Sequence, residues 1–99
     1  MYQLKSTPDF DEWLRDLTDK KGKARILARL EAVKLGNLGD FKSVGAGIRE
    51  FRVHVGPGYR VYFSQSGRTV LLLLCGGDKS TQTRDVAKAQ RLLKTLAKE

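Results

Sequence analysis

The sequence predicts one α+β domain over residues 1–99, with an antiparallel sheet of about four strands, an N-terminal helical hairpin and a C-terminal helix. Three observations predict this class. Apolar and polar side chains alternate along residues 48–63, as they do on paired strands. Residues 70–74 are apolar at every position, which favours a strand covered on both faces. Apolar residues also recur at helical spacing near both ends of the chain.

The first half of the chain predicts a short strand and two helices. Residues 2–5 alternate, and Thr7-Pro8-Asp9 is typical of a helix start, because Thr7 can cap the first turn and Pro8 fits the first helical position. A turn at residues 19–22 leads to a second helix that Gly36 can end. Apolar stripes mark the buried sides, and we interpret Trp13 as a core anchor. The stripes comprise Phe10, Trp13, Leu14 and Leu17, and then Ile26, Leu27, Leu30 and Val33.

Residues 37–47 are interpreted as a connection that brings the chain to the sheet. The segment contains several glycines, and Asn37 and Asp40 are typical of turns. It lacks the G-x-x-x-x-G-K-[ST] arrangement, so it does not indicate a phosphate loop.

A hairpin with a three-residue loop, Gly56-Pro57-Gly58, is predicted next. We expect Val55 to face Tyr59 across it, so that His54 faces Arg60 and Arg52 faces Tyr62. One side of this hairpin is apolar and can cover a core. The other side is the candidate functional face, and it gathers Glu50, Arg52, His54, Arg60 and Tyr62.

The C-terminal part predicts a strand at residues 70–74 and a final helix. The segment 76–79 ends the strand, and Ser80 or Thr81 can cap the helix. The side chains expected to face inward are Val86, Ala89, Leu93 and Leu96.

Composition narrows the function classes. The net charge is +8, and it is uneven: residues 1–47 carry nine basic and seven acidic side chains (+2), whereas residues 48–99 carry ten and four (+6). This favours a polyanionic partner such as nucleic acid, or an acidic protein. The single Cys75 excludes an internal disulfide and is expected in the core, and with one histidine the chain predicts no zinc site and no cofactor. With no signal peptide or membrane-spanning run, a cytoplasmic protein without membrane contact is expected.

Five motifs within residues 10–90 are shared with a known family. They are F-x-x-W-L at 10–14, G-N-x-G-D-x-K-x-V-G-x-G at 36–47, E-F-R at 50–52, G-P-G-Y-R-V-Y-F at 56–63 and L-L-L-x-G-G-D-K-S-x-Q at 72–82. In combination they resemble the Gp49-like (HigB-type) branch of the RelE/ParE superfamily of type II toxins.

The resemblance implies a microbial-RNase-like (RelE-like) fold, metal-independent cleavage of mRNA on the ribosome, and neutralisation by a cognate antitoxin, a HigA-like helix-turn-helix protein. Carried over by position, the cleaving groups of the RelE branch become Arg52, Arg60 and Lys79. The tyrosine that RelE toxins use near the C-terminus has no counterpart, since residues 83–86 read T-R-D-V. The superfamily also contains ParE proteins, which inhibit DNA gyrase without cutting RNA.

The residues themselves suit ribonuclease chemistry. Arg52 and Arg60 can bind phosphate and stabilise charge, with Lys79 as a third cation. Either His54, with its proton affinity lowered beside Arg60, or Glu50 can act as the general base, although Glu50 can instead pair with Arg52 and simply hold it in place. A gyrase inhibitor and a non-catalytic nucleic-acid-binding module stay as alternatives. The residues assigned to RNA contact are Arg49, Tyr62, Gln82 and Arg84.

Overall fold

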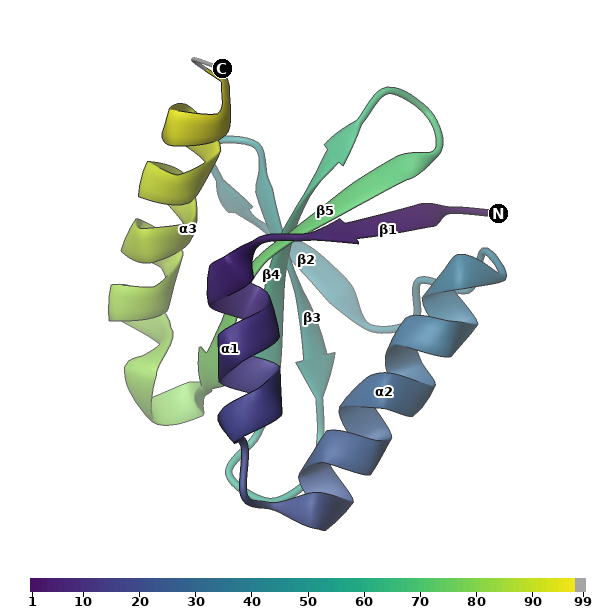
Figure 1. Cartoon of the computed structure of the whole chain (residues 1–99), viewed down its shortest axis with the longest axis vertical. Helices are drawn as coiled ribbons and strands as arrows, with labels where there is room; N and C mark the ends of the chain where they lie inside the picture. The colour runs from purple at the N-terminus through teal and green to yellow at the C-terminus, as the bar shows by residue number, and fades with distance from the viewer. Residues whose placement is uncertain (98–99) are drawn as a thin grey trace.

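The computed structural model describes residues 1–97 as one mixed sheet with helices on both of its faces (Figure 1). The strands are β1 (Gln3–Ser6), β2 (Phe41–Gly45), β3 (Ile48–Val53), β4 (Tyr59–Ser66) and β5 (Val70–Asp78). The helices are α1 (Pro8–Asp16), α2 (Lys20–Lys34), the short 3-10 helix η1 (Lys79–Thr81) and α3 (Gln82–Ala97). The sheet order is β1-β5-β4-β3-β2. The α+β class, the helical hairpin and the C-terminal helix are confirmed, whereas the sheet has five strands rather than about four.

The prediction of a purely antiparallel sheet is wrong at one edge, because β1 runs parallel to β5. Parallel pairing requires a long crossover connection, and here the chain passes through both helices and three further strands between β1 and β5. The fully apolar segment of β5 lies between β1 and β4 and is covered on both faces, as predicted.

Two hydrophobic clusters hold the helices on the sheet. Helices α1 and α2 pack on one face, where Phe10, Ile26 and Val33 meet Phe51 and Phe63. Helix α3 packs on the other face through Ala89 and its partly buried neighbours, against Ile48, Tyr62, Leu74 and Cys75. Trp13 is half-buried against the first cluster, and Cys75 is buried in the second, so both are core residues as predicted. No helix within residues 1–97 is long and apolar enough to cross a bilayer.

The helix starts depend on side-chain caps. Thr7 caps α1 by accepting a hydrogen bond from the Phe10 amide at 3.0 Å, with Pro8 at the first helical position, as predicted. The predicted turn at residues 19–22 is wrong, since α2 already begins at Lys20 with Asp19 as its cap. Asp19 accepts from the Gly22 amide at 3.0 Å and from the Tyr59 hydroxyl at 2.7 Å, which joins the start of α2 to β4.

The interpretation of residues 37–47 as a plain connection is also wrong, because strand β2 lies inside it. Strand β2 pairs antiparallel with β3, and a tight turn at Ala46 and Gly47 joins them. Both turn residues have positive φ, 55° and 77°, which matches the twist of a two-residue hairpin. The strand is mostly exposed at the sheet edge, so it carries no apolar alternation that the sequence could display.

The β3–β4 hairpin has a different register from the predicted one. Val53 rather than Val55 is the Cα partner of Tyr59, and residues 54–58 form the loop. Consequently Arg52 is opposite Arg60, and Glu50 is opposite Tyr62. Gly56 and Gly58 have φ of 55° and 80°, so the longer loop takes both of its glycines into the left-handed region.

Asp78, rather than Ser80 or Thr81, is the capping residue before the last helix, and it caps the 3-10 turn η1 that leads into α3. Asp78 accepts from the Ser80 amide at 2.8 Å and forms a capping box with Thr81 around η1. Hydrogen bonds lower the pKa of Asp78, and the one from the Ser80 side chain has the largest effect. The 3-10 turn then delivers Gln82 to the start of α3.

Candidate functional site

Two arginines lie side by side on the α3 face of the sheet, beyond the part that α3 covers with apolar side chains. Arg52 on β3 and Arg60 on β4 are Cα partners, and directly opposed residues of antiparallel strands share a face. Like charges in this position repel each other unless anions compensate them. We call these residues the Arg52–Arg60 pair.

Glu50 forms a buried ion pair with Arg60. The Glu50 side chain is 0% exposed and that of Arg60 is 12% exposed, and their atoms Oε1 and Nη1 are 3.0 Å apart. Gln82 donates from Nε2 to the second oxygen, Oε2, at 3.2 Å, and Lys42 Nζ lies 4.0 Å from Oε1. The alternative that Glu50 pairs with Arg52 is therefore wrong: its partner is Arg60, which the true register places diagonally across from Glu50, while Arg52 pairs with Asp40.

Asp40 holds Arg52 and His54 together. Its Oδ1 accepts from Nη2 of Arg52 at 2.8 Å, and its Oδ2 is 2.7 Å from Nε2 of His54. The hydrogen bonds from His54 and then from Arg52 lower the pKa of Asp40. His54 was expected beside Arg60, which is wrong, since the loop carries it to Asp40 instead. The sequence assigned Asp40 only to a turn, so this contact was missed.

A third arginine, Arg29 of α2, fixes the backbone around this group. It donates to three carbonyl oxygens, those of Arg52 at 2.9 Å, Leu38 at 2.9 Å and Asp40 at 2.6 Å. Its guanidinium also lies over the Phe51 ring, 5.3 Å from the centroid. Partial burial lowers the pKa of Arg29. The residue therefore anchors the segment that carries Asp40 to the end of β3, a role that the sequence did not indicate.

The residues expected to contact RNA separate in the structure. Tyr62 is 0% exposed under α3, and burial raises the pKa of its hydroxyl, so it cannot stack on a base as expected. Arg49 is on the opposite face of the sheet, against Phe41 and Gln65, because it alternates with Glu50 along β3. Arg84 is exposed at the start of α3, 3.6 Å from Asp85, and remains accessible from outside.

Gln82 and Lys79 lie at the edge of the candidate site. Gln82 is partly buried and engaged with Glu50, so in this arrangement it supports the site from inside the fold. Lys79 is exposed in η1. Its Cβ lies close to Gly58, because a Cβ placed on that glycine would be 3.7 Å from the Cβ of Lys79. It therefore stands beside the β3–β4 loop, next to the strand end that carries Arg60.

The double glycine before Lys79 has a packing role that explains its position in the motif. A Cβ on Gly76 would overlap the Trp13 ring, and a Cβ on Gly77 would overlap the Asp85 carboxylate. Gly76 thus lets α1 approach one face of β5, and Gly77 lets the start of α3 approach the other. Gly77 is also the Cα partner of Arg60, which brings the α3 start to the candidate site.

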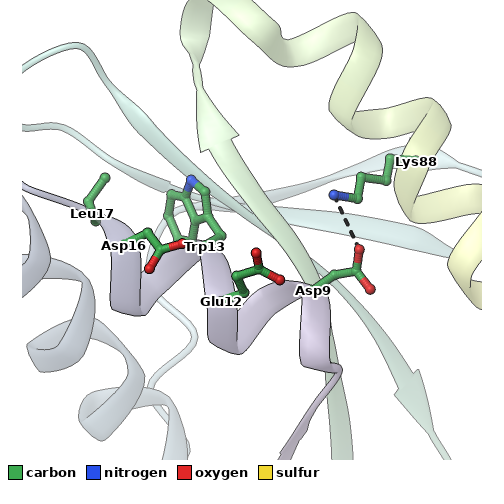
Figure 2. Close-up of a pocket in the computed structure, with 6 residues that line it drawn as sticks. All are labelled: Asp9, Glu12, Trp13, Asp16, Leu17 and Lys88. Atoms are coloured by element: carbon green, nitrogen blue, oxygen red, sulfur yellow. Dashed lines mark ion pairs between the residues drawn. The ribbon is translucent and has the colours of Figure 1, made fainter.

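A hollow on α1 is unsuitable for an anionic ligand. Asp9, Glu12 and Asp16 point into it around Trp13, and Lys88 reaches across to Asp9 at 3.3 Å (Figure 2). Its carboxylates outnumber its one cation, so it repels phosphate. No group of three His, Cys, Asp or Glu side chains within residues 1–97 is arranged to hold a metal ion.

The geometry supports binding of a phosphodiester. In the described contacts, carboxylates engage Nη1 of Arg60 and Nη2 of Arg52, so each guanidinium keeps a second terminal nitrogen for a ligand. Guanidinium forks match phosphate oxygens, and the partial burial of Arg60 strengthens such contacts. His54 supplies an exposed imidazole oriented by a carboxylate, which is the arrangement of a general base.

Comparisons with known proteins identify the family and the fold. The model of the family "Phage derived protein Gp49-like (DUF891)" matches residues 12–98. An uncharacterized protein of Haemophilus influenzae is 47% identical over 94 residues, which cover 95% of each chain. A chain of the E. coli DinJ–YafQ complex superposes with a TM-score of 0.61 at 12% identity, over 82% of this chain and 97% of that one. YafQ alone, also from E. coli, gives 0.54 at 13% identity over 83% and 98%.

Proposed function

Because the chain belongs to the Gp49-like family and has the RelE-like fold of YafQ, we propose that it is the toxin of a type II toxin–antitoxin pair. Its activity is metal-independent endonucleolytic cleavage of mRNA on the ribosome, in the manner of HigB-type toxins. It acts in the cytoplasm, where translation takes place. One of the similar structures is that of the E. coli DinJ–YafQ complex, which supports a protein partner that neutralises this chain.

The observation that carries the proposal is the Arg52–Arg60 pair with its separate carboxylate supports. In the proposed reaction the 2′-oxygen attacks the adjacent phosphorus, the P–O5′ bond breaks, and a 2′,3′-cyclic phosphate forms. Charge develops on the phosphoryl oxygens, and the two guanidiniums stabilise it. These groups supply the positive charge that the reaction needs without a metal ion.

We assign the proton transfers to His54 and solvent. His54 takes the proton of the 2′-hydroxyl, and Asp40 orients its ring and stabilises the imidazolium that forms. Water returns a proton to the leaving 5′-oxygen. Glu50 is enclosed, with both oxygens engaged, so we assign it to hold Arg60 rather than to act as the base. Lys79 contributes a third positive charge at the rim, and the ribosome positions the strand.

The antitoxin should cover the same surface. An acidic or amphipathic segment of a HigA-like helix-turn-helix protein would neutralise the basic face that holds Arg52, His54 and Lys79. Binding that weakens as salt rises would support a charged contact of this kind.

Controlled expression in bacteria tests the function directly. Wild type, Arg60→Ala and the matched control Arg68→Ala are induced, and mRNA 5′-ends are mapped within minutes. Arg68 is exposed in the turn between β4 and β5, at the other end of the sheet. We expect growth arrest with new, in-frame ends for wild type and the control, and none for Arg60→Ala. Growth arrest without new ends would rule out the nuclease and direct attention to DNA gyrase.

A further inference from the structure

A basic hollow adjoins the candidate site. It is lined by Arg25, Ala28, Arg29, Arg52, Val53 and His54, between α2 and the end of β3, and has a volume of about 380 Å³. We call it the α2 cleft. Arg52 lines it and also belongs to the Arg52–Arg60 pair, so the two sites share this residue.

The lining of the α2 cleft is positive and held in place. Arg25 and Arg29 are four residues apart on α2 and therefore share a face of the helix. Arg29 is fixed by its bonds to the Arg52 and Asp40 carbonyls, whereas Arg25 is exposed. No carboxylate lines the hollow within the described residues, and the nearby Asp40 is already engaged by Arg52 and His54.

We infer that the α2 cleft binds a backbone phosphate of single-stranded RNA, next to the phosphate at the Arg52–Arg60 pair. Arg25 supplies an exposed guanidinium, Arg29 supplies fixed positive charge, and Arg52 lies between the two phosphates. The inference rests on the proposed function, since it identifies the ligand as the RNA strand that is cut. It adds Arg25, which has no part in the cleavage chemistry, as a residue that positions the substrate.

The shared arginine favours RNA over an acidic protein segment. A strand whose scissile phosphate lies at Arg60 and Arg52 must continue past one of them, and Arg25 lines the same hollow as Arg52. Consecutive phosphates at regular intervals suit consecutive guanidiniums better than scattered carboxylates do. A phosphate contact also predicts a defined salt dependence, because each one releases condensed counterions.

The test compares Arg25→Gln with Arg68→Gln, which removes the same charge far from the cleft. The probe is a 2′-O-methylated single-stranded RNA, which cannot be cleaved through its 2′-oxygen, and its affinity is measured at several salt concentrations. We expect Arg25→Gln to weaken binding on the order of tenfold and to reduce the salt slope by about 0.7, the value for one phosphate on a single strand. Arg68→Gln should change neither quantity appreciably.

The outcomes separate this inference from the proposed function. Equal behaviour of the two variants, or a wild type that does not bind the probe, overturns the inference. If Arg25→Gln binds the RNA probe as well as wild type but no longer binds the antitoxin, the inference is overturned in favour of an acidic protein contact. The expected RNA result, combined with no new mRNA ends in cells, supports the cleft as an RNA site and refutes the nuclease.

Discussion

The two arginines of the site are paired across neighbouring strands, yet their carboxylate partners have opposite surroundings. Glu50, which holds Arg60, is 0% exposed, whereas the Asp40 side chain, which holds Arg52, is 41% exposed. A buried anion that loses its cation is strongly destabilising, while an exposed ion pair contributes little to stability. Arg60 should therefore support both the fold and the reaction, and Arg52 mainly the reaction.

This difference matters for any experiment that removes a charge. Loss of activity in an Arg60 variant can arise from a weakened fold as well as from the missing guanidinium. Loss of activity in an Arg52 variant points to the site itself. Stability and cleavage must therefore be measured together for both arginines.

The largest effect should come from Arg60→Ala. Cleavage should be abolished, and the free energy of unfolding should fall by about 3–5 kcal/mol, because Glu50 is left buried without its ion-pair partner. Urea denaturation of the purified chain measures the second quantity. A variant with wild-type stability would contradict the buried pair.

A double substitution distinguishes the two contributions of Arg60. Arg60→Met combined with Glu50→Gln removes both charges and keeps similar side-chain volumes. We expect this variant to regain most of the lost stability, because a neutral amide costs far less to bury than a carboxylate. Cleavage should stay absent, since the guanidinium is still missing. Recovery of cleavage would show that Arg60 acts only through the fold.

Arg52→Ala should have a large effect on cleavage and a small one on stability. Its ion pair with Asp40 is exposed, so we expect the free energy of unfolding to change by no more than about 1 kcal/mol. Cleavage should fall by about 10²–10³, the range for loss of one charge-stabilising donor. The same urea titration and 5′-end mapping measure both. A destabilisation as large as that of Arg60→Ala would remove the contrast between the two arginines.

The sequence predicted the elements that carry strong periodic signals. The apolar stripes of α1 and α2, the cap at Thr7 and the apolar core of β5 all depend on spacing along the chain, which is local information. Strand β2 was missed because it is short, exposed and at the sheet edge, where burial does not impose alternation. The Gly76-Gly77 pair was noted only as the strand end, since its reason is the approach of α1 and α3 from opposite faces.

The candidate site was predicted in its residue types but not in its pairings. A hairpin register shifted by two residues keeps Glu50, Arg52 and Arg60 on one face but changes which of them meet. The choice between a three-residue and a longer loop depends on how the loop packs, for example on Tyr59 reaching Asp19. Asp40 could not be assigned, because its partners are twelve and fourteen residues away along the chain.

Asp40→Asn should have the smallest effect on stability, and that effect should depend on pH. Hydrogen bonds from His54 and Arg52 lower the pKa of Asp40 in the folded chain below its value in the unfolded chain, about 3.9. This contribution to stability is therefore complete above about pH 4 and is lost as the pH falls through the lowered pKa. The stability difference between wild type and Asp40→Asn should shrink under acidic conditions, as thermal unfolding at pH 7 and pH 3 would measure.

The same variant tests the role of His54. If Asp40 orients the imidazole as a general base, cleavage should fall on the order of tenfold, which is part of the 10²–10⁴ that such a base provides. Asp16→Asn, an exposed carboxylate on α1, is the matched control and should leave cleavage unchanged. Unaltered cleavage in Asp40→Asn would mean that Asp40 does not orient a catalytic imidazole, and the assignment of His54 as the general base would lose its structural support. The chemistry would then depend on the guanidiniums of Arg52 and Arg60, whose contrast the stability measurements test separately.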